Sequence, residues 1–422
     1  MNELYKLPDG WKWVIIKDVL KTTQSGIWGD EIFDAPNNEI YPIIRSTEID
    51  HNGKIMVNDK IVYRRVKPEK AKKYFLKQND LLIVRSGGTT GKIILGRVGI
   101  YNGEPDKYLF SNFLLKVQVD ENIILSEFLW YYLNWKKFLE ENIPNLIRQT
   151  TGIQNLPIED YFSIKIPLPP LSEQKRIVEK IKTLMDDIEK AKNACEKQIE
   201  AAEALFSAYL REIFESEEAK KWERKKLNEA CEYNSGIWGD EPDNSNNCYF
   251  ILRSNNIKDG KMIYEEIAIR KINSKYVEEK SLKLGDILVT TSSGSKDLLG
   301  KSAIFIPPDD KTYLFSNFTM RLRSIYSIVN YFYLYFYLQS PQAKKVLQLI
   351  QDTTTGLRNL DRKEFLNQYI PLPPLKTQQR IVNYLKEKLA YVENLKSKIN
   401  DLKSTIDALP QSILKKAFKG EL

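Results

Sequence analysis

Ile166-Pro-Leu-Pro-Pro-Leu-Ser-Glu-Gln-Lys-Arg-Ile-Val178 is a segment that recurs almost unchanged as Ile370-Pro-Leu-Pro-Pro-Leu-Lys-Thr-Gln-Gln-Arg-Ile-Val382. Each copy begins with an apolar run, which a pair of prolines interrupts, and continues into a long stretch that is rich in charged and apolar residues. Proline can neither donate to a strand ladder nor continue a helix, so the pair ends the preceding strand. Each copy therefore predicts a short strand followed by a long helix.

The repetition extends outward from this segment over most of the chain. Ser25-Gly-Ile-Trp-Gly-Asp-Glu31 recurs as Ser235 to Glu241, and Tyr108-Leu-Phe-Ser-Asn-Phe113 recurs as Tyr313 to Phe318. Thr150-Thr-Gly152 also recurs, as Thr354 to Gly356. Self-similarity of this kind is typical of a duplicated structural unit. The sequence therefore predicts one unit that occurs twice, each time followed by a long helix.

The two long stretches carry apolar or small residues at steps of three and four, which is the heptad pattern of a coiled coil. A helix of roughly 40 residues is on the order of 60 Å long, at about 1.5 Å per residue, and a small domain cannot bury its whole stripe. We therefore expect the two helices to form an antiparallel coiled coil, with Pro410 bending or locally breaking the second. The expected seam residues are Val178, Ile181, Met185, Ile188, Ala191, Cys195, Ala202, Leu205 and Tyr209 in the first helix, and Val382, Leu385, Leu389, Val392, Leu395, Ile399, Leu402, Ile406, Leu409 and Ile413 in the second.

The segments outside the helices contain short runs of Ile, Val, Tyr and Phe between Gly, Asn, Asp and Pro, which is typical of strands and turns. Each segment also has one expected helix, near 126–141 and near 327–350. The expected fold class is α+β: two similar mixed α/β domains in a pseudo-two-fold repeat, held a fixed distance apart by the two helices. The expected boundaries are 1–165 for the first domain, 166–217 for the central helix, 218–369 for the second domain and 370–422 for the C-terminal helix.

The sequence offers few residues for catalysis. His51 is the single histidine and lies in an Asp-His-Asn-Gly turn, while Cys195, Cys231 and Cys248 have no zinc-binding spacing. These residues cannot build a histidine-based zinc centre, a Ser-His-Asp triad or a Cys-His pair. The run 294–302 resembles a P-loop, but its glycine spacing is one residue too long and a strand-like run follows. We expect no catalytic residue, no metal site and no cofactor in this chain.

Composition favours a folded protein that can bind nucleic acid. Hydrophobic residues make up 42% of the chain and aromatic residues 11%, which is enough for packed cores. Lys and Arg number 64 against 56 Asp and Glu, so the net charge is +8. A mildly basic balance is compatible with a nucleic-acid partner. No apolar run approaches the roughly 18–20 residues of a membrane span, and the N-terminal residues lack a signal-peptide core, so we expect a cytoplasmic protein without a membrane partner.

Duplicated loops that carry Arg, Lys, Ser, Thr and Gly are the candidate DNA contacts. Arginine binds guanine or phosphate with two hydrogen bonds, hydroxyls reach bases or phosphates, and glycine lets backbone N–H groups approach the duplex. Trp28 and Trp238 could stack on DNA, but a repeated aromatic residue is more typical of a local core. The expected DNA-binding residues are Arg45, Ser46, Arg85, Ser86, Gly87, Thr89, Thr90, Lys92, Arg148, Gln149, Thr150 and Thr151 in the first domain, and Arg253, Ser254, Ser292, Ser293, Lys296, Lys301, Thr354, Thr355 and Arg358 in the second.

The duplicated Ile-Pro-Leu-Pro-Pro-Leu-x-x-Gln-x-Arg-Ile-Val element and the ending Ile413-Leu-Lys-Lys-Ala-Phe-Lys-Gly-Glu-Leu422 resemble the conserved regions of type I restriction-modification specificity subunits. The resemblance covers essentially the whole chain. It implies two target-recognition domains, each reading one half of a split double-stranded DNA target. It also implies helices that dock two modification (methyltransferase) subunits, which a restriction (motor-nuclease) subunit joins. S-adenosylmethionine, ATP and magnesium would then belong to the partner subunits, and this chain would not be an enzyme.

Other interpretations stay open on the sequence. A self-contained nuclease or methyltransferase would need a carboxylate or cofactor-binding constellation, which we do not find. The specificity subunit could serve one fused methylase-nuclease in place of separate subunits. A coiled-coil adaptor with two protein-binding domains would have no role on DNA. The two helix ends also differ, since Phe214-Glu-Ser-Glu217 stands where Phe418-Lys-Gly-Glu421 does, so identical contacts are not expected there.

Overall fold

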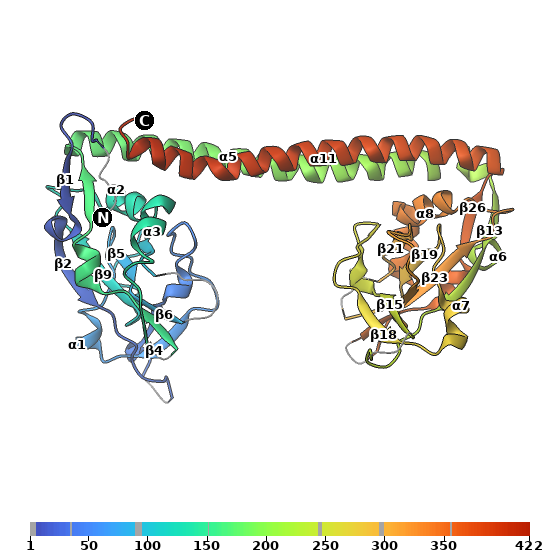
Figure 1. Cartoon of the computed structure of the whole chain (residues 1–422), viewed down its shortest axis with the longest axis horizontal. Helices are drawn as coiled ribbons and strands as arrows, with labels where there is room; N and C mark the ends of the chain where they lie inside the picture. Colours follow the sequence, from blue (N-terminus) through green and yellow to red (C-terminus); the bar gives the residue numbers. More distant parts are fainter. Residues whose placement is uncertain are drawn as a thin grey trace. The chain divides into compact units, whose positions relative to one another are not determined.

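The computed structural model describes residues 6–33, 36–88, 95–150, 152–243, 247–294, 299–354 and 357–422. They form two compact units: unit 1 comprises Met1–Ala194 and Leu402–Leu422, and unit 2 comprises Cys195–Asp401. Each unit contains small β-sheets, short helices and a segment of both long helices, α5 (Leu171–Phe214) and α11 (Leu375–Ala417) (Figure 1). The strand order of the sheets is the same in both units, which confirms the expected α+β duplication.

Unit 1 is built on a four-stranded antiparallel sheet with two smaller sheets and a strand pair around it. Its strands are β1 (Lys12–Ile15), β2 (Leu20–Ser25), β3 (Ile40–Ile44), β4 (Val62–Arg65), β5 (Leu81–Val84), β6 (Ser86–Gly88), β7 (Val98–Ile100), β8 (Leu109–Phe110), β9 (Leu114–Val119), β10 (Arg148–Thr150), β11 (Ile153–Asn155) and β12 (Lys165–Leu168). The main sheet has the order β2-β9-β5-β7, and the others are β4-β3-β8, β10-β11-β6 and β1-β12. All four residues of β5 are buried, which is typical of a continuous apolar strand.

Unit 2 repeats each of these sheets. Its strands are β13 (Glu223–Lys226), β14 (Cys231–Ser235), β15 (Cys248–Leu252), β16 (Ile257–Lys258), β17 (Lys261–Met262), β18 (Ala268–Lys271), β19 (Ile287–Thr290), β20 (Ser292–Ser293), β21 (Ser302–Ile304), β22 (Tyr313–Phe315), β23 (Thr319–Ser324), β24 (Gln351–Thr354), β25 (Leu357–Leu360) and β26 (Tyr369–Leu372). The main sheet is β14-β23-β19-β21, and β18-β15-β22, β20-β25-β24 and β13-β26 complete the correspondence. The β16-β17 pair is an addition to this set. In both units one strand pair is parallel, β3 with β8 and β15 with β22.

Two short helices in each unit pack next to the main sheet. They are α2 (Ser126–Leu133) and α3 (Lys136–Asn142) in unit 1, and α8 (Tyr331–Gln339) and α9 (Pro341–Leu349) in unit 2 (Figure 1). The sequence predicted one helix at each place, and this is wrong. In unit 2 the side chain of Ser340 caps α9 and Pro341 occupies its first turn, so α8 has to end there. In unit 1 the Asn134 side chain bonds the backbone of Val98, which holds the chain out of helix after α2.

The long helices are continuous and antiparallel to each other within each unit. In unit 1, Lys192 Nζ lies 2.6 Å from Asp407 Oδ1. In unit 2, Lys396 Nζ lies 2.6 Å from Glu203 Oε1. A later residue of α5 thus pairs with an earlier residue of α11: Lys192 pairs with Asp407, and Glu203 pairs with Lys396. This confirms the antiparallel prediction. Of the described helices, none is long and apolar enough to cross a membrane.

The buried positions of α5 and α11 recur every seven residues. They are Ile181, Ile188, Cys195 and Ala202 on α5, and Leu385, Val392, Ile399 and Ile406 on α11. This confirms the heptad pattern and the interpretation of Cys195 as a packing residue. Leu402 and Leu409 are 50% and 41% exposed, so their assignment to the seam is wrong, because two paired helices bury a narrower stripe than the one predicted. The predicted local break at Pro410 is also wrong: α11 continues through it, with buried Ile406 and Leu414 packed on either side.

A buried glutamine fixes the start of each long helix to its unit. Gln174 donates to the carbonyls of Ile123 at 3.0 Å and Pro169 at 2.9 Å, and it accepts from the N–H of Leu125 at 2.8 Å. Gln378 makes the same three hydrogen bonds in unit 2, at 3.0, 2.9 and 2.9 Å. The glutamine of the duplicated Gln-x-Arg-Ile-Val element therefore joins helix, strand end and neighbouring loop.

We expect Gln174→Ala and Gln378→Ala each to destabilise its own unit by about 3 kcal/mol, since buried groups left without a partner cost about 1–3 kcal/mol each. Denaturant unfolding gives the total loss, and amide hydrogen exchange assigns it to one unit. Lys175→Ala, an exposed neighbour on α5, is the control and should stay within about 0.5 kcal/mol of the parent. Equal loss of protection in both units from either glutamine variant would contradict this anchoring role.

Candidate nucleic-acid interface

The Ser-Gly-Ile-Trp-Gly-Asp-Glu motif packs against the Tyr-Leu-Phe-Ser-Asn-Phe motif in both units. The N–H of Ile27 donates to the carbonyl of Phe110 at 2.9 Å, and unit 2 repeats this bond at 2.8 Å. A Cβ atom on Gly26 or Gly236 would lie 2.1 Å from a backbone oxygen of the second motif. Only glycine permits so close an approach. The duplication of both motifs therefore has a packing cause.

The tryptophan of each motif lies under an arginine at the surface. The guanidinium carbon of Arg64 lies 4.6 Å from the ring centroid of Trp28, and that of Arg270 lies 4.5 Å from Trp238. Each arginine also pairs with the glutamate that ends the motif. The tryptophans are 36% and 41% exposed, so their interpretation as local core is wrong. The isoleucine beside each tryptophan packs on the core instead.

A cavity of about 510 Å³ opens beside Trp238 in unit 2. It brings the predicted DNA-binding pair Arg253-Ser254 together with Trp238 and with the end of the Tyr-Leu-Phe-Ser-Asn-Phe motif. The sequence predicted that motif only as part of the duplication, although its unchanged recurrence is a signal that can mark a site. The residues that line the cavity are Trp238, Arg253, Ser254, Asn255, Ser316, Asn317 and Phe318.

The small sheet of unit 2 meets this cavity at Phe318. β20 carries Ser292 and Ser293 and pairs with β25, which carries Arg358, while Thr354 belongs to the third strand, β24. The N–H of Ser292 donates to the carbonyl of Phe318 at 3.3 Å. The structure therefore places three of the predicted contact segments next to one another. Lys301, which was also predicted, precedes β21, and its carbonyl accepts from the main sheet.

Unit 1 arranges its predicted contacts on the equivalent sheet. β6 carries Ser86 and Gly87, β10 begins with Arg148, and β11 joins the two strands. The hydroxyl of Ser86 donates to Asn155 Oδ1 at 2.7 Å, and the equivalent bond of unit 2 has the same length. Arg148 is exposed and pairs with Asp160 at 3.1 Å. Gln149 and Thr150 follow on β10, whereas the predicted contacts Thr89, Thr90, Lys92, Thr151, Lys296 and Thr355 lie outside the described residues.

Arg85 belongs to a hydrogen-bond network inside unit 1. Its guanidinium donates to the carbonyl of Asn112 at 3.1 Å and to the hydroxyl of Ser25 at 3.0 Å. In unit 2 the corresponding residue is Thr291, and Arg362 makes the equivalent bonds from another place in the chain, at 3.4 and 2.7 Å. An arginine at this point therefore joins the two repeated motifs in both units, and it has a structural role at the edge of the predicted interface.

The two units differ in charge at the arginine of the Arg-Ser pair. Arg45 donates two hydrogen bonds to Glu48, at 2.6 and 3.1 Å, whereas Asn256 stands at the equivalent position of unit 2. Arg253 donates to the carbonyl of Glu266 at 2.8 Å, and within the described ranges no carboxylate forms an ion pair with it. The cavity of unit 2 therefore carries a positive charge that a carboxylate balances in unit 1.

Hydrogen bonding keeps the carboxylate of unit 1 ionised. Burial would raise the pKa of Glu48, but the side chain and backbone N–H of Arg45 and the hydroxyl of Thr47 outweigh it, so this pKa lies below its ordinary value. The hydrogen bond to Glu48 likewise raises the pKa of Arg45. The pair is thus charged on both sides, and Arg45 is held by a partner within its own unit.

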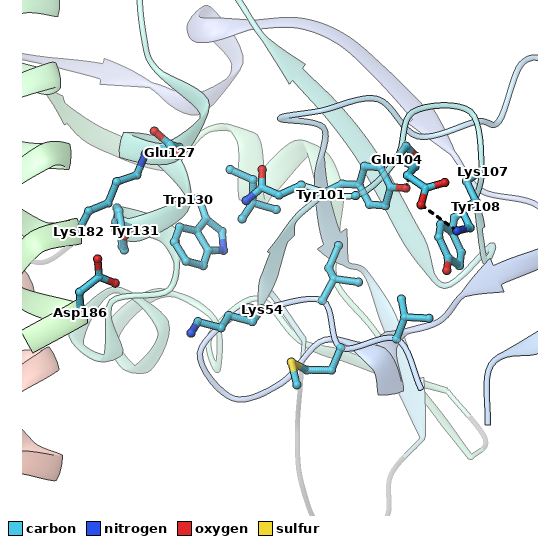
Figure 2. A pocket seen from close by; sticks show the side chains of 16 residues that line it. Lys54, Tyr101, Glu104, Lys107, Tyr108, Glu127, Trp130, Tyr131, Lys182 and Asp186 are labelled. Carbon is cyan, nitrogen blue, oxygen red and sulfur yellow. Dashed lines mark hydrogen bonds and ion pairs between the residues drawn. The ribbon is translucent and has the colours of Figure 1, made fainter. Parts of the chain in front are cut away.

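A second hollow in unit 1 lies away from these residues. Figure 2 shows a pocket of about 690 Å³ between the loop that carries Lys54, the end of the main sheet, α2 and α5. Lys182 of α5 pairs with Glu127 of α2 at 2.6 Å, and Trp130 donates to the carbonyl of Val98 at 2.9 Å. The described lining includes none of the predicted DNA-binding residues. We assign this hollow to the packing of α2 against α5.

The side chains at the candidate interface are of the kinds that bind nucleic acids. Aromatic rings, hydroxyls, amides and guanidinium groups are the groups with which proteins contact bases and phosphates. Among the residues that the structure describes, no group of three or more His, Cys, Asp or Glu could hold a metal ion. The groups at the candidate interface match those that contact a polar, aromatic, anionic ligand.

Comparison with known proteins finds one family along almost the whole chain. The family model described as "Type I restriction modification DNA specificity domain" matches twice, over residues 8–200 and 219–404. The chain is 25% identical to the type I restriction enzyme EcoKI specificity subunit of Escherichia coli (strain K12), over 99% of this chain and 90% of that protein. It is also 25% identical to the StySPI specificity subunit of Salmonella potsdam, with the same coverage.

Solved structures share the fold. One chain, from a study of complex assembly and conformational transition of the type I R-M system, matches with a TM-score of 0.70 and 22% identity, over 99% of this chain and 100% of that chain. The HsdS subunit from Thermoanaerobacter tengcongensis matches with a TM-score of 0.55 and 23% identity, over 100% and 99% of the two chains.

Proposed function

The chain belongs to the type I restriction-modification DNA specificity family, and on this basis we propose how its two units divide one DNA target between them. It is the specificity subunit of a type I restriction-modification system and has two DNA recognition domains. We infer that each domain reads one half of a split double-stranded target. The observation that carries this proposal is the duplication of one surface, an exposed tryptophan under an arginine beside a small three-stranded sheet, on which the contact residues differ between the units.

The two half-sites are related but not identical, and they have inverted orientation. Glu48 balances Arg45 in unit 1, whereas Asn256 stands at that position in unit 2 and no carboxylate among the described residues pairs with Arg253. Surfaces that differ in charge select different bases or base steps. The antiparallel order of α5 and α11 supports the inversion. A footprint over a perfect interrupted palindrome would contradict this part of the proposal.

The chain delivers catalytic partners to the target and does no chemistry itself. We infer that α5, α11 and the surfaces beside them dock two methyltransferase subunits, which bind S-adenosylmethionine. A motor-nuclease subunit, which uses ATP and magnesium, joins this complex in the cytoplasm. A single fused methylase-nuclease would meet the same helices, and co-purification of the chain with its partners distinguishes the two arrangements.

The experiment exchanges one recognition domain and maps the modified bases. The chain is produced with its methyltransferase subunit, the complex is given DNA and S-adenosylmethionine, and methylated adenines are located by sequencing. We expect methylation at one split motif. Replacing residues 218–369 by the equivalent domain of a relative should change one half of the motif and leave the other half unchanged, because each domain reads its own half.

Exchange of residues 1–165 is the matched control and should change the opposite half only. Methylation that does not depend on this chain would overturn the proposal. Absence of DNA binding at low and high salt, with the partner subunits present, would favour a protein adaptor.

A further inference from the structure

The cavity beside Trp238 has polar groups in its wall whose hydrogen-bonding capacity the described residues leave unused. Ser316 is 1% exposed, and its hydroxyl has no hydrogen-bond partner there. The Nε atom of Arg253 is also buried and without a partner in the described part of the chain. Both residues line the cavity. Buried polar groups are nearly always paired, so two such groups in one cavity wall point to a ligand.

The same cavity exposes two aromatic rings. Trp238 is 41% exposed and Phe318 is 49% exposed. Arg270 lies over the indole of Trp238 and leaves part of the ring free. Exposed aromatic rings beside hydroxyl and guanidinium groups match a planar ring with a polar edge. The volume of about 510 Å³ is within the range of small-ligand sites.

Charge identifies the ligand further. Arg253 brings a cation to the cavity, and in the described residues no carboxylate neutralises it, while Arg45 in unit 1 is bound by Glu48. Arginine is the side chain that most often binds the acceptor atoms of guanine and of phosphate. The cavity also adjoins the small sheet through the bond from Ser292 to Phe318. A ligand that combines an aromatic ring bearing hydrogen-bond acceptors with an anionic backbone is a nucleotide.

We propose that this cavity binds one nucleotide of the half-site read by unit 2, unstacked from its neighbours, with its base on Trp238 and Phe318 and its acceptor atoms on Arg253. This inference rests on the proposed function and deepens it. Removing a base from the duplex stack costs free energy, and stacking on aromatic side chains offsets that cost. Arg253 then determines specificity, whereas Arg45 contributes less in unit 1 because Glu48 already accepts hydrogen bonds from two of its guanidinium nitrogens.

Photochemical cross-linking tests the contact directly. The chain is assembled with its methyltransferase subunits on target DNA in which one base of the second half-site at a time is replaced by a photoreactive analogue, 5-iodouracil or 5-iodocytosine for a pyrimidine and 6-thioguanine or 8-bromoadenine for a purine. We expect irradiation to join one position to Trp238 or Phe318, as mass spectrometry of the cross-linked peptide would show. Specific binding with cross-links only outside the cavity would overturn this inference and leave the proposed function intact. Failure to bind the target at all would overturn the proposed function as well.

Substitutions in the cavity give a second, quantitative test. Trp238→Ala should weaken target binding by about 5- to 150-fold, which corresponds to the loss of about 1–3 kcal/mol of base stacking, while Trp238→Phe keeps most of the affinity. Arg253→Met should weaken binding. It should also lower the slope of log affinity against log salt concentration by the amount expected for about one charge, whereas Arg253→Lys should keep that slope. The control is Tyr326→Ala, an exposed aromatic residue of unit 2 outside the cavity.

A variant in unit 1 completes the comparison. Glu48→Gln removes the charge that binds Arg45. We expect it to raise the slope of log affinity against log salt concentration by up to the amount for about one charge. The circular dichroism spectrum of each variant must match that of the parent. Trp238→Ala and Arg253→Met that fold and bind the target with unchanged affinity would overturn the inference.

Discussion

Replacing Phe418 by alanine is expected to lower the unfolding free energy of unit 1 by about 3–5 kcal/mol, the cost of truncating a fully buried phenylalanine. Phe418 is completely buried, and its ring centroid lies 4.9 Å from that of Tyr132, 5.6 Å from Trp135 and 5.7 Å from Phe128. The residue follows the last turn of α11. The C-terminal segment of the chain is therefore part of the core of unit 1, and truncation before Phe418 should have at least the same effect.

Phe214→Ala is the matched variant in unit 2. Its ring centroid lies 5.5 Å from that of Tyr333 and 5.4 Å from that of Tyr337, at the end of α5. We expect a similar loss that is confined to unit 2. Hydrogen exchange resolves the two units, and denaturant unfolding measures the total. Tyr391→Ala, at an exposed position of α11, is the control; a loss from Phe418→Ala no larger than that of this control would contradict the anchoring role.

The two helix ends share this anchor but differ beyond it, as the sequence indicated. After Phe214, the hydroxyl of Ser216 accepts from the N–H of Ala219 at 3.0 Å, and the chain continues into unit 2. After Phe418, Gly420 adopts a positive φ of 72° close to Pro8. The duplicated phenylalanine therefore anchors a long helix in the core of each unit. The residues after Phe214 lead the chain on into unit 2, whereas those after Phe418 pack near Pro8 of the N-terminal segment.

The duplicated architecture could be predicted because equal sequence motifs require equal packing partners. The Gln-x-Arg-Ile-Val element is an example, since Gln174 and Gln378 make the same buried bonds in both units. The width of the helix seam could not be predicted, because the heptad pattern gives the direction of a stripe and not how much of it the partner covers. Leu402 and Leu409 fit the pattern and are nevertheless exposed.

The candidate site was harder to predict because tertiary contacts decide it. Arg85 and Arg362 make equivalent hydrogen bonds in the two units, but they stand at different positions of the repeat. Aligning the two copies of the sequence therefore does not match one arginine with the other. The exposure of Trp238 depends on Arg270, which comes from a strand some distance along the chain. The sequence predicted Arg253 and Ser254 as contacts but not their position beside Phe318, since only the folded sheet brings these segments together.

Replacing Gly236 by alanine is expected to have the largest effect on recognition of a single half-site. An added Cβ would lie 2.1 Å from the carbonyl oxygen of Ser316 and 2.3 Å from that of Phe315, and backbone atoms cannot yield as a flexible side chain does. The segment that carries Phe318 must therefore shift. Overpacking of this kind costs about 1–3 kcal/mol or more, so we expect a loss of at least about 3 kcal/mol in unit 2.

The shift should also disable the adjoining cavity and the bond from Ser292 to Phe318. We expect Gly236→Ala to abolish the sequence preference for one half of the methylated motif and to keep the other, and Gly26→Ala to have the mirror effect, because the same clash arises at 2.1 Å in unit 1. Gly294→Ala is the control, since an added Cβ there meets no described atom within 4 Å. A Gly236→Ala protein as stable as Gly294→Ala, with both half-sites still read, would show that the contact between the two repeated motifs does not hold the recognition surface.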